Sequence, residues 1–242
     1  SRGLGDVYKR QLWCRKNGTM PHGNNNYGKD SAYTHEHGEE SSNDSGKTGR
    51  CFTGSGPVTW NHNHHGDGIC DLNGNVWEWN AGMRLVDGEI QIIPYNNAAM
   101  GSKCDMSASS TLWKAIKADG SLVEPGTAGT LKWDWVSGKI QLTSGAITYK
   151  TDSGVGGQYK DMTLASGLTA PEIAKMLLLY PDEPNGDYAG DYHWFNPVGE
   201  RLPICGGSWY NGAGAGVFHL YLNDPRSNAG WHIGVRSAFV DL

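Results

Sequence analysis

The side chains with the clearest capacity for chemistry are the histidines and acids that crowd one short, Gly-rich run. This run carries His62, His64, His65 and Asp67. A zinc ion takes about four ligands in tetrahedral geometry, and one flexible loop rarely supplies all of them. The run is therefore predicted to be a polar surface loop. The sparser set of His35, Glu36 and His37 is a weaker metal candidate.

Oxygen-bearing side chains in the same region offer a second kind of ion site. The set consists of Asp67, Asp71, Asn73, Asn75 and Glu78. Loops rich in carboxylate and amide oxygens suit calcium, but Asp and Asn also form turns with the nearby backbone. Turn formation and a buried salt bridge are the favoured roles, so neither a metal ion nor another cofactor is predicted.

The five cysteines are widely spaced and form no CxxC pair. They are Cys14, Cys51, Cys70, Cys104 and Cys205. An odd number argues against a complete disulfide framework, so these residues are expected to be buried as small apolar side chains. A bridge between Cys51 and Cys70 stays open as an alternative.

Composition bounds the classes of function that this chain can have. Among 242 residues there are 35 glycines and 10 tryptophans, and the net charge is −5. Such a chain can bury a core, but one interrupted by many turns. The sequence has no basic stripe of the kind that binds nucleic acid. It also has no apolar stretch that approaches the ~20 residues needed to cross a bilayer. Neither nucleic-acid binding nor direct membrane insertion is expected.

The start of the chain stands apart from the rest. Residues 1–11, SRGLGDVYKRQ, lack a hydrophobic period and helix caps. Within them, DVYKRQ is what a common transposase-adapter sequence encodes in one reading frame. We interpret residues 1–11 as a non-native scar or a disordered segment, which leaves residues 12–242 as the domain. A signal or anchor of the natural protein would then be missing from the sequence.

Local patterns predict several strands and one helix. GNVWEW (Gly74–Trp79) alternates between two faces, and Glu89–Pro94 continues as a strand. Residues 108–159 are interpreted as an inserted β-rich segment, with strands at 112–116, 130–135 and 139–143 and a two-residue hairpin loop at Ser137-Gly138. A helix is predicted from Thr169, as its cap, to about Leu179, and residues 181–194 are expected to form a loop.

The strand near residue 220 has two unlike faces. Its apolar face, suited to a core, carries Phe218, Leu220 and Leu222. Its opposite face, aromatic and polar, carries His219, Tyr221 and Asn223. A strand that alternates in this way packs one side inward and leaves the other for contacts. Ile233, Val235 and the tail at residues 237–240 are expected to add a closing strand.

Three motifs occur in order: GNVWEW at Gly74–Trp79, GGSW at Gly206–Trp209 and IGVR at Ile233–Arg236. They resemble the formylglycine-generating-enzyme subtype of the C-type lectin fold, in which the last motif usually reads GFR. The chain is more closely similar to the variable proteins of diversity-generating retroelements, in which such motifs frame the diversified region. The resemblance implies an α+β, loop-rich fold with an insert at about 108–159 and a variable region at about 206–238.

The motifs also have a physical meaning as a scaffold. The scaffold residues are Gly74, Trp77, Trp79, Gly206, Gly207, Trp209 and Arg236. Glycine permits backbone conformations and close approaches that a side chain blocks, and tryptophan anchors a loop-rich fold from within. Arg236 is expected to pair with Glu78 or to bind buried carbonyls through its fork of donors.

The resemblance further implies which side chains are exchanged. Such retroelements mutate template adenines, and an Asn codon altered at its first two bases can encode Tyr, His, Asp, Gly, Ala, Asn or Ser. Residues of this set between the motifs are Tyr210, Asn211, Gly214, His219, Tyr221, Asn223, Asp224, Asn228, Gly230 and His232. Trp231 falls outside the codon set and is included as a candidate contact. Tyr offers contact area and a hydroxyl at low entropic cost, while Asn and Gly adapt.

The implied function is non-enzymatic binding of a protein or glycan on a host or target cell. The preferred setting is a phage or prophage receptor-binding protein on the virion, and a binder displayed on the bacterial cell surface is the close alternative. An oxidase of the formylglycine-generating type would need a cysteine pair near the C-terminus for copper, whereas Cys205 stands alone before GGSW. A calcium-dependent carbohydrate lectin is a further alternative.

Overall fold

The protein is built mainly from short strands, as the computed structural model shows for the backbone of residues 4–236 and the side chains of residues 10–236. The strands of the large sheet are β3 (Trp77–Trp79), β4 (Met83–Val86), β5 (Glu89–Ile92), β6 (Lys114–Ile116), β7 (Leu122–Val123), β8 (Lys132–Val136), β9 (Lys139–Thr143), β10 (Val155–Gln158), β11 (Thr163–Leu164), β12 (Tyr192–Phe195), β13 (Glu200–Gly206), β14 (Gly216–Asp224) and β15 (Ile233–Gly234). A separate pair is formed by β1 (Asn43–Asp44) and β2 (Lys47–Thr48). The helical elements are α1 (Leu4–Asn17), α2 (Glu172–Met176) and the 3-10 turns η1 (Val58–Trp60), η2 (Pro94–Lys103), η3 (Tyr159–Asp161) and η4 (Gly212–Gly214).

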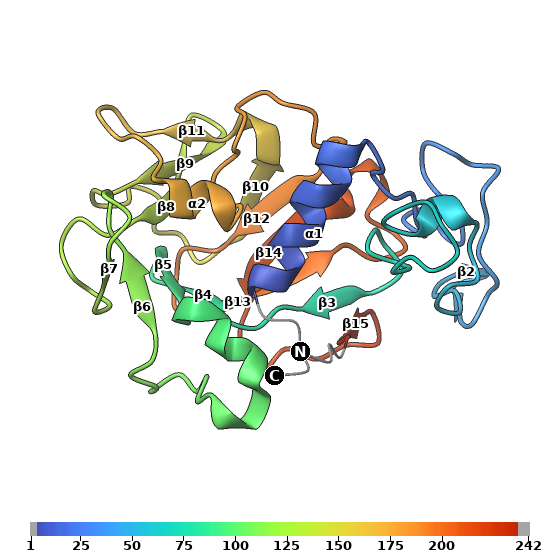
Figure 1. The fold of residues 1–242 in the computed structure, drawn as a ribbon, viewed down its shortest axis with the longest axis horizontal. Helices are drawn as coiled ribbons and strands as arrows, with labels where there is room; N and C mark the ends of the chain where they lie inside the picture. The colour runs from blue at the N-terminus through green and yellow to red at the C-terminus, as the bar shows by residue number, and fades with distance from the viewer. Residues whose placement is uncertain (1–3, 237–242) are drawn as a thin grey trace.

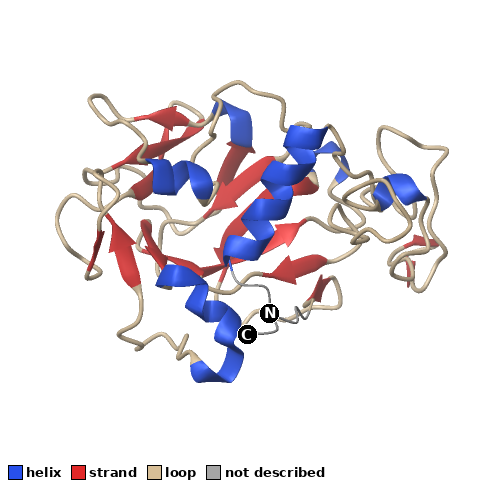
Figure 2. Cartoon of the chain, viewed as in Figure 1, coloured by secondary structure: helices blue, strands red, loops and turns tan. Residues whose placement is uncertain are grey.

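The large sheet is mixed and runs in the order β10-β12-β14-β13-β4-β5-β8-β9-β11 (Figure 1). Strand β14 pairs parallel to β12 and antiparallel to β13, while β3 pairs with β13 and β15 pairs with β3. The fold is therefore mixed α and β, rich in strands, with few helices and long loops (Figure 2). Within the described residues no helix has the length and apolar character needed to span a membrane.

The predicted alternation of β14 is confirmed on its apolar side. Phe218, Leu220 and Leu222 are all buried in the main hydrophobic core. This core also holds Trp133 and Phe195, whose rings meet edge to face at 5.9 Å between centroids. Helix α1 crosses in front of β13 and β14 and covers this side of the sheet (Figure 1).

Helix α1 corrects the interpretation of residues 1–11 as a segment without order, because the helix begins at Leu4. Local sequence gave no sign of this helix, and contacts with distant parts of the chain hold its described side chains. Gln11 is buried and its Nε2 donates a hydrogen bond to the Val217 carbonyl. The Arg15 guanidinium lies 4.5 Å above the ring centre of Tyr188.

The β-rich interpretation of residues 108–159 is confirmed, since β6 to β10 all lie there. The hairpin loop between β8 and β9 has both of its residues in the left-handed region, with φ of 52° at Ser137 and 77° at Gly138. Such a two-residue loop matches the twist of the flanking strands. The segment does not form a separate unit, because β8 pairs with β5 and β10 pairs with β12.

The prediction for residues 169–194 is wrong in its extent. Helix α2 is only five residues long and begins after Pro171, without a side-chain cap from Thr169. Leu178 turns into the left-handed region at φ 54°, which ends the helical path before Leu179. Met176, the last residue of α2, is 66% exposed. Strand β12 also begins within the stretch expected to be a loop.

The polar N-terminal loops are held by buried side chains rather than by long elements. Asn24 Oδ1 accepts the N–H of Gly28 at 2.7 Å, and Asp30 Oδ1 accepts two successive N–H groups at 2.8 and 2.9 Å. At the other end of the chain, the expected closing strand is present as the two-residue β15, and its continuation at residues 237–240 lies outside the described residues.

Candidate ligand-binding face

The outward face of β14 lies against Trp77 of β3. The imidazole of His219 meets the Trp77 ring edge to face, with centroids 4.5 Å apart, and the Tyr221 ring lies 5.3 Å from the same indole. Asn223 Nδ2 donates a hydrogen bond of 2.8 Å to the Tyr221 hydroxyl. The side of the strand opposite the core is thus an ordered set of aromatic and amide groups.

A hollow of about 290 Å³ opens over this face. It is lined by Trp77, Gly154, Trp194, Asn211, His219, Tyr221 and Asn223. Four of these residues belong to the set predicted to be exchangeable. The structure therefore brings Asn211, from the loop after GGSW, together with the three outward residues of β14.

A second group of predicted residues surrounds Trp209. This indole is fully buried and donates from Nε1 to Asp44 at 2.9 Å. The ring of Tyr210 lies 5.5 Å from it and the ring of Trp231 lies 4.6 Å from it. Tyr210 is 44% exposed and Trp231 is 50% exposed, while His232 stands 6.2 Å from Tyr210. Tyr210 and Trp231 are thus exposed aromatic side chains on a buried indole, and the half-buried His232 lies beside them.

The other predicted contact residues are not gathered in either group. Gly214 ends η4 beside Tyr192, and Asp224 closes β14 at its pairing with β13. Asn228 lies in the turn after β14, and the Gly230 carbonyl accepts the N–H of Ile233. The predicted set is therefore divided between the hollow, the Trp209 group, η4, the end of β14 and the loop between β14 and β15.

His219 requires a correction, because it is only 3% exposed and is not the free surface contact that its face of β14 suggested. Trp77 packs against it, and neither of its ring nitrogens has a hydrogen-bond partner among the described residues. Burial lowers the pKa of His219 to about 3, against a smaller opposing effect of the Gly214 backbone, so the ring is neutral. Asn211 also braces its loop, since its Oδ1 accepts from Ser208 N and Oγ, each at 2.8 Å.

The scaffold residues occupy positions that explain their types. Gly74 has φ of +72°, and a Cβ there would lie 2.1 Å from the Asn24 carbonyl oxygen. Gly207 has φ of +83°, and a Cβ there would lie 2.6 Å from that of Ala215. Gly206 also has positive φ, at +89°. Only glycine adopts such conformations at little cost, so these residues fix how closely the loops approach.

Both predicted roles of Arg236, pairing with Glu78 and binding a backbone carbonyl, are confirmed. Its Nε and Nη2 donate to Glu78 Oε1 at 2.9 and 2.7 Å, and Nη2 also reaches the Asp71 carbonyl at 3.3 Å. Trp77 is buried and Trp79 is half-buried on β3, and Trp77 packs against the outward face of β14. The part of the variable region at residues 237–238 lies outside the described residues.

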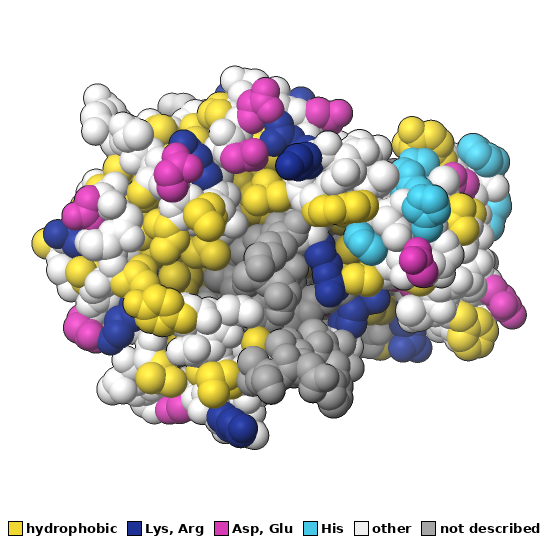
Figure 3. Space-filling model, viewed as in Figure 1, with side chains coloured by type: hydrophobic (Ala, Val, Ile, Leu, Met, Phe, Trp, Pro, Cys, Tyr) yellow, Lys and Arg dark blue, Asp and Glu magenta, His cyan; other side chains and the backbone are white. Residues whose placement is uncertain are grey.

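The candidate ion ligands have structural partners. Asp71 Oδ2 accepts the Gly54 N–H at 3.0 Å, and Asn75 Oδ1 accepts the Cys51 N–H at 2.8 Å. His62 Nδ1 accepts the N–H of Ile69 at 2.9 Å. Histidines do gather over the N-terminal loops (Figure 3), but no group of three or more His, Cys, Asp or Glu side chains within residues 10–236 could hold a metal ion.

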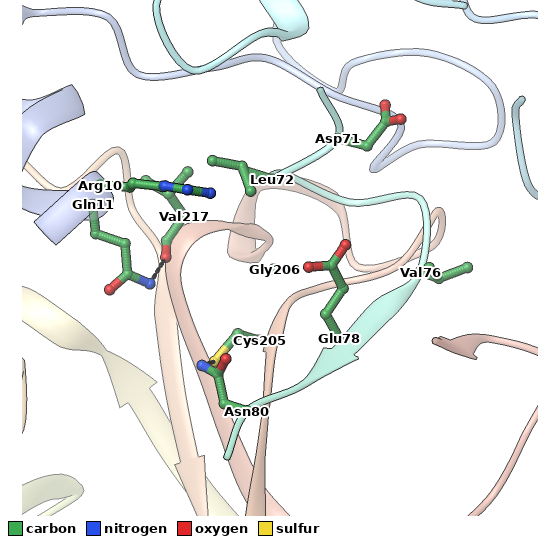
Figure 4. Close-up of a pocket in the computed structure, with 10 residues that line it drawn as sticks. All are labelled: Arg10, Gln11, Asp71, Leu72, Val76, Glu78, Asn80, Cys205, Gly206 and Val217. Atoms are coloured by element: carbon green, nitrogen blue, oxygen red, sulfur yellow. Dashed lines mark hydrogen bonds between the residues drawn. The ribbon is translucent and has the colours of Figure 1, made fainter. Parts of the chain in front are cut away.

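The five cysteines are free thiols, so the alternative bridge between Cys51 and Cys70 is not formed. Burial raises the pKa of Cys14 to about 11 and that of Cys51 to about 12, which keeps both protonated at neutral pH. Cys205 lines a pocket of about 20 Å³ beneath α1, where Asn80 Nδ2 lies 2.8 Å from its sulfur (Figure 4). That volume suits about one water molecule.

Trp194 and Gly154 complete the hollow and were not among the predicted residues. Trp194 is paired in register with Tyr221 of the parallel neighbour β14, so the two side chains stand on the same side of the sheet. The tetrad Tyr192–Phe195 alternates between half-buried and buried residues in the structure, and the available signal in the sequence was its run of aromatic residues, which favour strands. Its position within an acidic, aromatic stretch suggested a loop instead.

No protein-family model matches the chain, and no curated protein matches its sequence significantly.

Proposed function

We propose that this protein is a non-enzymatic binding protein of the C-type lectin fold, formylglycine-generating-enzyme subtype, that presents interchangeable side chains to a protein or glycan ligand. It would be a variable protein of a diversity-generating retroelement. Its setting would be a phage or prophage receptor-binding protein on the virion, or a binder on the bacterial cell surface.

One observation carries the proposal. Strand β14 places Phe218, Leu220 and Leu222 in the core, while Tyr221 and Asn223 line a hollow with Asn211. Tyr221 and Asn223 can therefore change without altering the residues that hold the strand. A fixed framework with exchangeable contacts is the arrangement that antibody loops use.

The direct test is the DNA that flanks the coding sequence. The proposal expects a reverse-transcriptase gene and a near-copy of the segment that encodes residues 206–238, with adenines in the template at the codons for the predicted exchangeable residues. A flanking region without such a template, or a template whose adenines fall at the Phe218, Leu220 and Leu222 codons, would overturn the proposal.

A protein-level test compares the two faces of one strand. Tyr221→Ser and Asn223→Ser are each expected to lower the unfolding free energy by less than about 1.5 kcal/mol, because both side chains are half-buried and the larger loss is the contact of the Tyr221 ring with Trp77. The matched variant Leu222→Ser removes a fully buried side chain and should cost about 3 kcal/mol or more. Equal losses on both faces would contradict exchangeability.

The rival functions have their own readouts. An oxidase of the formylglycine-generating type should be stabilised by copper, and a calcium-dependent lectin by calcium, because an ion that binds the native state raises Tm. We expect neither ion to raise Tm above that of a magnesium control.

A further inference from the structure

The 3-10 turn η4, between GGSW and β14, borders two recesses of the protein. Asn211, directly before the turn, lines the hollow, whereas Ala213 within it lines a larger cleft of about 600 Å³. That volume falls within the range of ligand pockets. The other walls of the cleft come from the N-terminal loops, including His22 and Tyr33, and from the loop before β12. Those walls lie outside the variable region at 206–238, so any variation within the cleft has to come from η4 and the start of β14.

The alanines of the variable region differ in what surrounds them. Alanine is among the residues that an altered Asn codon can encode, and local sequence does not separate Ala213 from Ala215, two residues later. In the structure Ala213 is exposed, whereas Ala215 is only 4% exposed. A Cβ at Gly207 would lie 2.6 Å from the Ala215 Cβ, so the Ala215 methyl group packs against the GGSW backbone. Ala229 is also exposed, but it lines neither recess.

The backbone of η4 accepts side chains at its second and third positions. Gly212 has φ of +60°, a left-handed conformation that other residues adopt only at a cost. Ala213 and Gly214 are not in the left-handed region. A Cβ at Gly214 would lie 3.4 Å from the nearest ring atom of Tyr192, which is an ordinary van der Waals distance. Larger side chains at 213 and 214 are therefore compatible with the turn.

Both ends of the turn are fixed by groups that do not involve these two side chains. The Gly212 N–H donates to the Asn25 carbonyl at 2.8 Å. At the other end, Asp191 Oδ2 accepts the Phe218 N–H at 2.7 Å, and a Cβ at Gly216 would lie 2.0 Å from Asp191 Oδ1. Residue 216 must therefore remain glycine, whereas residue 213 can change without moving the ends of the turn.

We propose that Ala213 is a further exchangeable contact residue, which determines the chemistry at the edge of the cleft as Tyr221 and Asn223 do in the hollow. Tyr, His or Asp at this position would bring a ring or a charge to a recess that is otherwise lined by constant residues. Contact residues that change on a constant scaffold are the arrangement already argued for β14. The inference rests on the proposed function and extends its contact surface across η4.

The first test sequences the variable region in many copies of the gene, together with its template. We expect an adenine at the first or second base of the template codon for Ala213, and different residues at 213 among the copies. The codon for Ala215 should have no adenine at these bases and should encode alanine throughout. A template with adenines at the Tyr210 and Tyr221 codons, but none at the first two bases of codon 213, overturns this inference and leaves the proposed function intact. Absence of any template overturns both.

The second test compares the two alanines in thermal melts of the full chain. Ala213→Tyr should shift Tm by less than about 3 °C, because its side chain extends from an exposed position. The matched variant Ala215→Tyr overfills a packed site and should lower Tm by about 5 °C or more. If Ala215→Tyr does not fold, Ala213→Val and Ala215→Val repeat the comparison with a smaller added side chain. A loss at residue 213 as large as that at residue 215 overturns the inference, whatever the flanking DNA contains.

Discussion

Acid should destabilise this protein through two buried histidines. His193 of β12 and His219 of β14 are both fully buried, and burial lowers the pKa of each from 6.5 to about 3. Their mutual repulsion lowers the pKa of His193 further. A depressed pKa in the native state means that the unfolded chain binds more protons between pH 3 and 6.5. The stabilising contribution of neutral burial is therefore complete above about pH 6.5 and is lost as the pH falls toward 3.

The size of the effect follows from the same shifts. One pKa unit corresponds to about 1.4 kcal/mol, so at about pH 5 each histidine should cost roughly 2 kcal/mol relative to neutral pH. Asp191 acts in the opposite direction, because burial raises its pKa and its protonation on acidification relieves a buried charge. The two histidines together should therefore cost at most about 4 kcal/mol, less whatever Asp191 returns.

The assay is urea unfolding at about pH 7 and pH 5 for the natural chain and for the double variant His193→Gln, His219→Gln. Only the change in unfolding free energy between the two pH values is compared, so a constant loss from the substitutions cancels. The natural chain should lose about 2–4 kcal/mol more than the double variant. Asp191→Asn should steepen the loss of the otherwise natural chain. Equal pH dependence in the natural chain and the double variant would refute the burial argument.

Three further predictions concern the scaffold, the face and ions. Gly207→Ala should lower the unfolding free energy by more than Gly138→Ala, because both have positive φ but only Gly207 would also clash with Ala215, and equal losses in thermal melts would contradict this. Tyr210→Ser should change stability by less than about 1 kcal/mol, whereas Trp209→Ala should cost about 3–5 kcal/mol, and a reversed order in urea unfolding would refute the assignment of contact and anchor. Calcium and copper should leave Tm unchanged in calorimetry, and a rise with either ion would point to a site that the neutral lining of the hollow does not offer.

The strands could be predicted where local sequence determines them. The alternation of β14 and the two-residue loop between β8 and β9 are local patterns, and both are present in the structure. Helix α1 could not be predicted, since its sequence has neither period nor caps and it is held by contacts such as that of Arg15 with Tyr188. Isolated helices of this length are marginal, and distant contacts decide whether they form.

The prediction of the candidate site from local sequence is limited in the same way. An alternating strand reveals that it has two faces, but not which other element covers the second one. The burial of His219 depends on Trp77, more than a hundred residues earlier in the chain, and the same indole also contacts the Tyr221 ring. Trp194 was missed for a related reason. It lines the hollow because its strand, β12, pairs with β14 in the register that places Trp194 beside Tyr221.

Because of these contacts, the three outward positions of β14 tolerate substitution to different degrees. At residues 221 and 223 a change of side chain alters the hollow, whereas at residue 219 it also alters the support beneath Trp77. A smaller residue at 219 would leave a void against that indole, and a charged residue would be buried without an ionic partner, so both would destabilise the fold. A neutral imidazole fills the space without burying a charge. Position 219 therefore belongs more to the scaffold than to the contact surface, and the narrow range of side chains that it accepts limits how far the face can be varied.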